Sequence, residues 1–130
     1  ELQSLQLIRK CLGEANLAIY KSKQVSKVDK TTLGYLNEAL LHYPHYPKAN
    51  YEKGLYFIQS GERENAKTKF ENSVEGDWNH WPSHMELAKL AKIGKEWQKA
   101  EMHFKIVLDL DPGNKQATIH LKQIQAAPKK

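Results

Sequence analysis

The sequence predicts an all-α protein built from antiparallel helix pairs, and three observations support this prediction. Apolar residues recur at intervals of three or four along the 130-residue chain, whereas the alternating pattern of strands is nearly absent. The predicted helices are joined by short turns, which favour antiparallel neighbours. A helix–turn–helix pattern also repeats every 34 residues, so the pairs are expected to stack into a solenoid.

The first half of the chain carries the signals of four helices. Residues 2–24 carry apolar side chains at helical spacing and are expected to form one long helix. The polar, lysine-rich stretch KSKQVSKVDKTT separates this helix from the next. The second helix is expected to stop before Pro44, because proline disfavours a helical conformation at the residue before it. A third helix is expected to end at Ser60 and Gly61, and a fourth near Gly76.

The second half carries three more helices. Ser83 and Glu86 have the spacing of a capping box, and Pro82 is expected to lie at the start of the fifth helix. The sixth helix is expected to stop at Pro112. The seventh, residues 115–126, has one apolar stripe among polar faces, as expected of a terminal cap, and residues 127–130 are expected to fray.

Small and aromatic residues recur in the 34-residue frame. Three pairs have this spacing: Ala66 and Ala100, Phe70 and Phe104, Gly54 and Ala88. With proline closing the repeat, this pattern resembles that of the tetratricopeptide repeat (TPR) family. The residues that carry the resemblance are Gly54, Ala66, Phe70, Ala88, Trp97, Ala100, Phe104, Pro44 and Pro112.

The resemblance implies a single domain over residues 1–126 and a right-handed superhelix of helix pairs. The first repeat is degenerate, because Tyr20 fills its small-residue position and Thr32 its alanine position. Its first helix is extended towards the N-terminus. The implied boundaries are 13–46, 47–80 and 81–114 for the repeats and 115–126 for the capping helix. Three pairs and a cap are the minimum for a stable array of this kind.

The resemblance also implies a concave groove, lined by the first helix of each pair, that binds a peptide or helix of another protein. Apolar side chains and lysines occupy the corresponding positions, which predicts a partner with apolar anchors and some acidic residues. The alternative is that these side chains pack against a neighbouring helix or another part of a longer chain. The predicted groove residues are Leu17, Lys21, Lys48, Tyr51, Glu52, Leu55, Ile58, Met85, Lys89, Lys92, Ile93 and Ile119.

One subgroup of the family clamps the terminal carboxylate of a chaperone tail with lysine, asparagine and arginine side chains. Of the matching positions in this chain only one is basic, and two glutamates would repel a carboxylate. We therefore expect the partner not to be a chaperone C-terminal tail. The matching positions are Leu17, Lys21, Glu52, Pro82 and Glu86.

No catalytic, metal or cofactor motif is present in the sequence. It has no glycine-rich phosphate loop, nucleophile elbow or paired cysteines. His80 and His84 have a zinc-like spacing, but Pro82 lies between them and no third ligand is near in sequence. We therefore expect neither an enzyme nor a metal or cofactor site. Cys11 is the single cysteine, which excludes an internal disulfide framework.

The net charge of +5 comes mostly from residues 81–130, which carry nine lysines against five acidic residues. Lysines in such excess usually lie on solvated helix faces. Because no basic motif with interleaved aromatic residues is present, the charge does not favour nucleic-acid binding. No apolar run has the length of a membrane span and no signal segment is present, so we expect a cytoplasmic protein that does not insert into membranes. Because the chain begins at Glu1, we also consider that it is a fragment of a longer one.

These observations favour a non-catalytic scaffold or adaptor that binds another protein. One alternative is a structural segment of a larger solenoid or multi-subunit assembly, and a less favoured one is a helical repeat that contacts nucleic acid. The stretch GDWNHWPSH falls at the junction of the second and third repeats. Trp78 and Trp81 are expected to pack there, so that replacing Trp78 by alanine would cost roughly 2–4 kcal/mol; the alternative is that they are exposed and contact a partner.

Overall fold

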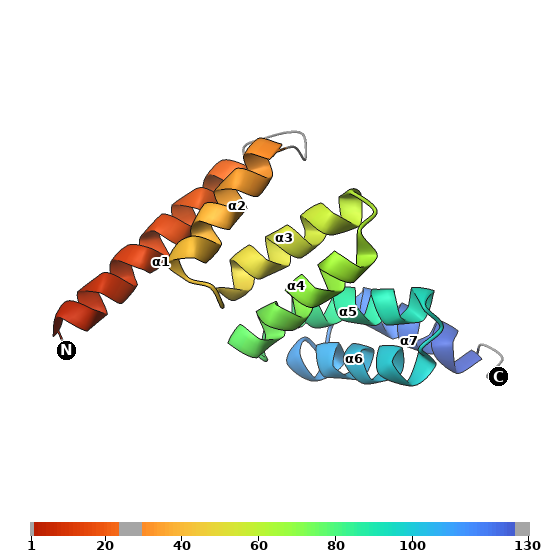
Figure 1. Ribbon diagram of the computed structural model, residues 1–130. Helices are drawn as coiled ribbons and strands as arrows, with labels where there is room; N and C mark the ends of the chain where they lie inside the picture. The colour runs from red at the N-terminus through yellow and green to blue at the C-terminus, as the bar shows by residue number, and fades with distance from the viewer. Residues whose placement is uncertain (1, 24–29, 127–130) are drawn as a thin grey trace. The chain divides into compact units, whose positions relative to one another are not determined.

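The computed structural model describes residues 2–23 and 30–126, and this part of the chain forms seven helices (Figure 1). Residues 24–29 of the lysine-rich connection and the predicted frayed tail at 127–130 lie outside the described residues. The helices are α1 (Leu2–Lys23), α2 (Lys30–His42), α3 (Pro47–Gln59), α4 (Arg63–Gly76), α5 (Trp81–Ile93), α6 (Trp97–Leu110) and α7 (Lys115–Ala126).

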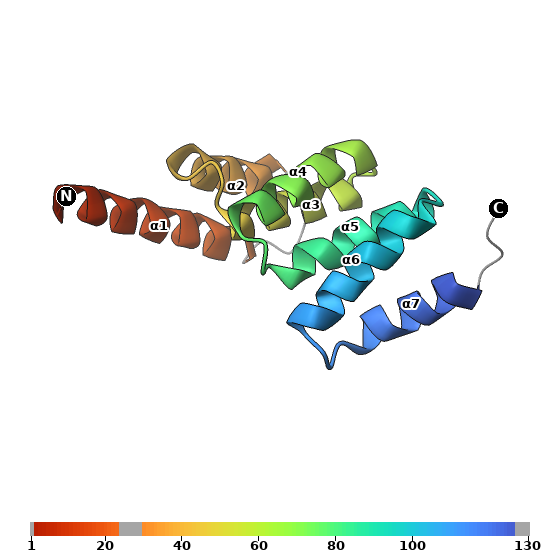
Figure 2. The same ribbon diagram turned by 90° about the horizontal axis from the view of Figure 1, so that it is seen from below.

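Consecutive helices pack as antiparallel pairs, α1 with α2, α3 with α4 and α5 with α6, and α7 packs on α6 (Figures 1 and 2). This arrangement confirms the prediction of an all-α protein made of helix pairs. The packing divides the chain into two compact units, unit 1 (Glu1–Gly76) and unit 2 (Asp77–Lys130). Unit 1 holds two helix pairs, and unit 2 holds one pair with the last helix.

The core of the α3–α4 pair depends on a glycine beneath an aromatic ring. Gly54 and Ala66 are buried, and the fully buried ring of Phe70 lies over Gly54. A Cβ atom at position 54 would lie 2.5 Å from Cε1 of Phe70. The two helices therefore approach closely because one of them has no side chain at the crossing. A second cluster in unit 1 joins the α1–α2 pair to the start of α3: Ala15, Ala18, Ile19, Leu36, Ala39, Tyr46 and Ala49.

Unit 2 repeats this arrangement with alanine in place of glycine. Ala88 on α5 and Ala100 on α6 are fully buried, and Phe104 fills the space beside them. Trp97 is partly buried and packs against the same cluster, as its place in the repeat frame predicts. The cluster also contains Ala117 and Ile124 of α7, so the apolar stripe of the predicted cap covers the end of the pair.

Prolines and one asparagine set the starts of the later helices. Pro47 and Pro82 occupy the first turns of α3 and α5, where a missing N–H costs nothing. Asn114 caps α7, because its Oδ1 accepts a hydrogen bond from the N–H of Ala117 at 2.9 Å. A buried asparagine, Asn50, donates to the carbonyl oxygens of Pro44 and Tyr46 and so holds the turn before α3.

The predicted capping box at the start of the fifth helix is wrong. The helix begins at Trp81 with His80 as its N-cap, so Ser83 lies inside the first turn and is fully buried. Its hydroxyl lies 2.7 Å from Nδ1 of His80. Pro82 accounts for the earlier start, because its fixed φ favours the first helical positions. None of the described helices is both long enough and apolar enough to cross a membrane.

Candidate functional site

In unit 1, the predicted groove residues of α3 follow one side of the helix. Lys48 is exposed, and Tyr51, Leu55 and Ile58 are partly exposed at steps of three or four residues. The Tyr51 ring packs on Phe70, with ring centroids 5.9 Å apart, so its inner edge belongs to the core. The other groove residue of this helix, Glu52, is also partly exposed. This side of α3 therefore presents an aromatic and aliphatic surface with a lysine at its start.

On α1, the predicted groove residues are more exposed. Half of the Leu17 side chain is open to solvent, at 52%, although the buried residues Ala15, Ala18 and Ile19 surround it in sequence. Lys21, one turn further on, places its ammonium 6.0 Å from the ring centroid of Tyr35 on α2. Leu17 is thus an apolar side chain that the α1–α2 pair does not need for its own packing.

In unit 2, apolar side chains stay exposed beside lysines on α5 and α7. Ile93 is 56% exposed and Ile119 is 54% exposed. Lys92 joins the two helices, because its Nζ donates to Nδ1 of His120 at 3.1 Å and also to Oε1 of Gln123. The ring of His120 lies flat on Phe104, 5.0 Å between centroids.

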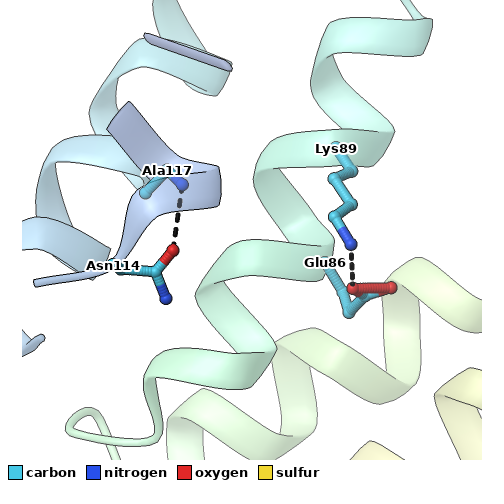
Figure 3. A network of polar contacts seen from close by, with 4 residues as sticks. All are labelled: Glu86, Lys89, Asn114 and Ala117. Atoms are coloured by element: carbon cyan, nitrogen blue, oxygen red, sulfur yellow. Dashed lines mark hydrogen bonds and ion pairs between the residues drawn. The ribbon is translucent and has the colours of Figure 1, made fainter. Parts of the chain in front are cut away.

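Lys89 forms an ion pair within its own helix. Its Nζ lies 3.1 Å from Oε2 of Glu86, one turn earlier (Figure 3). The Glu86 side chain is only 14% exposed and that of Lys89 is 37% exposed. Figure 3 also shows the cap of α7 between Asn114 and Ala117. The lysine therefore neutralises one of the two glutamates that were expected to repel a carboxylate.

Met85 does not belong to the exposed surface, and its predicted role as a groove anchor is wrong. Its side chain is only 4% exposed and lies in the core cluster of unit 2. Met85 lies three residues before Ala88, on the buried side of α5. The repeat frame places a residue along the helix, but it does not fix how far a flexible side chain folds into the core.

A hydrogen-bonded pair of histidines, one of them fully buried, is the feature of unit 2 that sequence reasoning missed. His84 is fully buried, and its Nε2–H donates to the carbonyl oxygen of Trp78 at 2.8 Å. Its other nitrogen, Nδ1, therefore accepts a hydrogen bond from Nδ1–H of His103, at 3.2 Å. Only the cluster of aromatic and histidine residues in GDWNHWPSH hinted at this contact, because His103 is distant in sequence.

The pair is held in its neutral form. Burial lowers the pKa of His84, and hydrogen bonding to Trp78 opposes this effect only in part. Burial lowers the pKa of His103 to about 4, and the charges of His84 and Lys99 act in the same direction. Among the described residues, no three His, Cys, Asp or Glu side chains gather in an arrangement that could hold a metal ion.

Trp78 contributes less packing than its sequence position predicts. More than half of its side chain is exposed, at 58%, and its ring meets His84 edge to face with centroids 4.7 Å apart. Trp81, by contrast, packs against the core cluster of unit 2. The expected loss of 2–4 kcal/mol for Trp78→Ala is therefore too large, since such losses require a buried side chain.

We expect Trp78→Ala to lower the free energy of unfolding by about 1 kcal/mol, the usual contribution of one aromatic contact. Trp81→Ala is the matched comparison and should cost roughly 2 kcal/mol, because it removes a partly buried ring that packs against the core cluster. Urea denaturation followed by circular dichroism measures both values. Equal losses for the two variants would show that the exposed ring packs as tightly as the half-buried one.

No model of a known protein family matches the chain, and no curated protein matches it. Solved structures do match it, at low sequence identity. The first TPR of Spaghetti (RPAP3), solved bound to the HSP90 peptide SRMEEVD, is 15% identical with a TM-score of 0.80; the match covers 88% of this chain and 92% of that one.

Two further structures match at similar levels. The Arabidopsis OM64 TPR domain is 17% identical with a TM-score of 0.70, over 92% of this chain and 95% of that one. The second TPR domain of human RPAP3, solved in complex with the HSP70 peptide SGPTIEEVD, is 14% identical with a TM-score of 0.75, over 92% and 99%. At these identities the likeness concerns the fold.

Proposed function

We propose that this chain, which has the fold of a tetratricopeptide repeat domain, is a non-catalytic module that binds a segment of another protein. The observation that carries the proposal is the exposure of apolar side chains next to lysines on α1, α5 and α7. Leu17, Ile93 and Ile119 are each more than half exposed, although every one of their helices also supplies residues to a core. Exposed apolar groups beside polar ones are typical of interaction surfaces.

The likeness to peptide-bound domains supports the same proposal. Two of the matching structures were solved with a bound peptide, so this fold is able to hold one. In this chain the bound segment would contact the first helix of each pair, on the side chains described above. In unit 2, its apolar residues would cover Ile93 and Ile119, which are both more than half exposed.

The experiment is a selection of binding peptides from a random library, followed by affinity measurements on variants. Ile93→Ser combined with Ile119→Ser should lower the affinity for the selected peptide by at least about tenfold, since each exposed anchor contributes on the order of 1 kcal/mol to binding. Met102→Ser is the matched control, because Met102 is 47% exposed but lies on α6, the second helix of its pair. Circular dichroism should show unchanged helicity in all variants.

Two results would contradict the proposal. One is a selection that yields no saturable binder. The other is a binder that Met102→Ser weakens and the isoleucine variant does not, which would place the interaction on the opposite helices.

A structural role in a larger assembly is the second candidate. Leu41 on α2 is 80% exposed and Leu7 on α1 is 62% exposed, and neither belongs to the proposed binding surface. Such side chains would be covered if further repeats or another subunit packed on this pair. Concentration-dependent self-association that Leu41→Ser abolishes would favour this second role. A steep salt dependence of binding to nucleic acid would instead favour a third, less supported role.

We also propose that a chaperone tail is not the partner, although two of the similar domains were solved with peptides that end in EEVD. The positions that the TPR resemblance matches to the carboxylate clamp hold Leu17, Glu52 and Pro82, which cannot bind a carboxylate. At the matching position 86, the glutamate holds Lys89 in an ion pair.

The two peptides SRMEEVD and SGPTIEEVD should therefore bind no more tightly with a free C-terminal carboxylate than with an amidated C-terminus. The control is the peptide selected from the library, titrated under the same conditions. Micromolar binding of either tail, lost in Lys21→Ala, would overturn the exclusion, since Lys21 is the only basic residue at the matching positions.

A further inference from the structure

We propose that Lys92 and His120, assisted by Lys89, form a cationic subsite that binds a side-chain carboxylate of the partner segment. The inference rests on the proposed function and specifies the chemistry that unit 2 recognises: an acidic residue next to an apolar one. The residues differ from the positions that the TPR resemblance matches to the carboxylate clamp, none of which lies on α7.

Among the residues that the structure describes, Lys92 has no acidic partner. Its ammonium donates to Nδ1 of His120 and to Oε1 of Gln123, which are both neutral acceptors. Within the described part of the chain, no carboxylate forms an ion pair with Lys92, whereas Lys89, Lys99 and Lys105 each have a glutamate one turn away. A partly buried ammonium without a counter-ion favours the approach of an anion.

The side chains of Lys89, Lys92 and His120 are brought together from two helices, α5 and α7. Lys89 and Lys92 are one turn apart on α5, and the hydrogen bond from Lys92 fixes His120 of α7 beside them. Stacking on Phe104 holds the imidazole ring in place. The Lys92 ammonium and the His120 imidazole are therefore oriented by the fold before any ligand binds, which lowers the entropic cost of binding.

Apolar side chains flank the cations. Ile93 lies one turn beyond Lys89 on α5, and Ile119 lies one turn before Gln123 on α7. Both isoleucines are more than half exposed. A segment that carries a carboxylate between apolar residues would satisfy both features, whereas a basic segment would be repelled.

Binding of an acidic group here should also take up a proton. Burial lowers the pKa of His120, and the charges of Lys92 and Lys89 lower it further. A carboxylate placed beside these lysines would counter their charge and raise that pKa again. Affinity for acidic segments should therefore increase as the pH falls from 7.5 to 5.5, where glutamate is still ionised.

The test uses two synthetic octapeptides as probes, one with glutamate and isoleucine in alternation and one with glutamine in place of every glutamate. We expect the acidic probe to bind at least about fivefold more tightly than the neutral one. Lys92→Gln should lower the affinity for the acidic probe about fivefold and leave the affinity for the neutral probe unchanged. A fivefold change corresponds to the contribution of one exposed ion pair. Lys122→Gln is the matched control, an exposed lysine on α7 outside the subsite.

The pH dependence gives an independent readout. The wild-type protein should bind the acidic probe about threefold more tightly at pH 5.5 than at pH 7.5. His120→Gln, which keeps an acceptor for Lys92 but does not titrate, should abolish this difference. NMR of the imidazole should show the pKa of His120 rising when the acidic probe is added.

Several outcomes would overturn the inference. Equal affinity for the two probes, absence of saturable binding of the acidic probe, or full affinity in Lys92→Gln would each do so. These results leave the proposed function standing if the library-selected peptide still depends on Ile93 and Ile119. If no selected peptide binds, the proposed function itself fails.

Discussion

Gly54→Ala should destabilise the protein by roughly 1 kcal/mol, although alanine is a better helix former than glycine. The added Cβ atom would lie 2.5 Å from Cε1 and 2.8 Å from both Cδ1 and Cζ of Phe70. Because the Phe70 side chain is fully buried, its ring cannot move aside without displacing the α3–α4 core. Overpacking of this kind costs about 1–3 kcal/mol and exceeds the gain in helix propensity of about 1 kcal/mol.

Gly34→Ala is the matched control for this prediction. Gly34 lies within α2, is exposed, and has no atom within 4 Å of the Cβ position. Helix propensity acts alone there, so the substitution should stabilise the protein by about 0.5–1 kcal/mol. Chemical denaturation of the two variants should therefore give shifts of opposite sign. A stabilising effect of Gly54→Ala would show that Phe70 is not held over position 54.

The free energy of unfolding should fall by about 3 kcal/mol between pH 7 and pH 4 through His103. The pKa of this side chain is lowered from 6.5 to about 4 in the fold. Between these two values the unfolded chain binds a proton that the folded chain excludes. The stabilisation is therefore complete above pH 6.5 and is lost as the pH falls to 4.

His103→Asn tests this pH dependence. The asparagine amide can donate to Nδ1 of His84, as the imidazole does, but it does not titrate. The loss of stability between pH 7 and pH 4 should shrink by about 3 kcal/mol in this variant. His45→Asn, at an exposed position in the turn before α3, should leave the loss unchanged. An identical pH profile for His103→Asn and the wild type would exclude His103 as the titrating group.

The repeat frame predicted the parts of the fold that depend on shape. Only a small residue fits where two helices cross, so a spacing of 34 between Gly54 and Ala88 locates the crossings directly. Phe70 and Phe104 follow for the same reason, since each fills the space beside a crossing. The turns at Pro44 and Pro112 were also predictable, because proline terminates a helix by steric conflict with the preceding residue.

Features that depend on contacts between distant residues could not be predicted. The His84–His103 hydrogen bond joins α5 to α6, and nothing in the sequence around His103 indicates it. Lys95 has a φ of 59°, in the left-handed region. The residue at the corresponding position of the second repeat is Gly61, with a φ of 79°. Lysine rarely adopts this conformation, so the turn after α5 is imposed by the helices that it connects. Met85 was misassigned because the repeat frame does not fix how far a flexible side chain folds into the core.

The aromatic residues are divided between the two units. All six tyrosines precede residue 77, and all three tryptophans follow it. Each unit therefore carries its own optical reporter: tryptophan emission follows residues 77–130, and tyrosine absorbance follows residues 1–76. A single denaturation sample shows whether the helix pairs unfold together or in sequence, because coincident curves indicate one cooperative transition. The destabilisation caused by Gly54→Ala should then appear first as a change in tyrosine absorbance. The destabilisation caused by protonation of His103 in acid should appear first as a change in tryptophan emission.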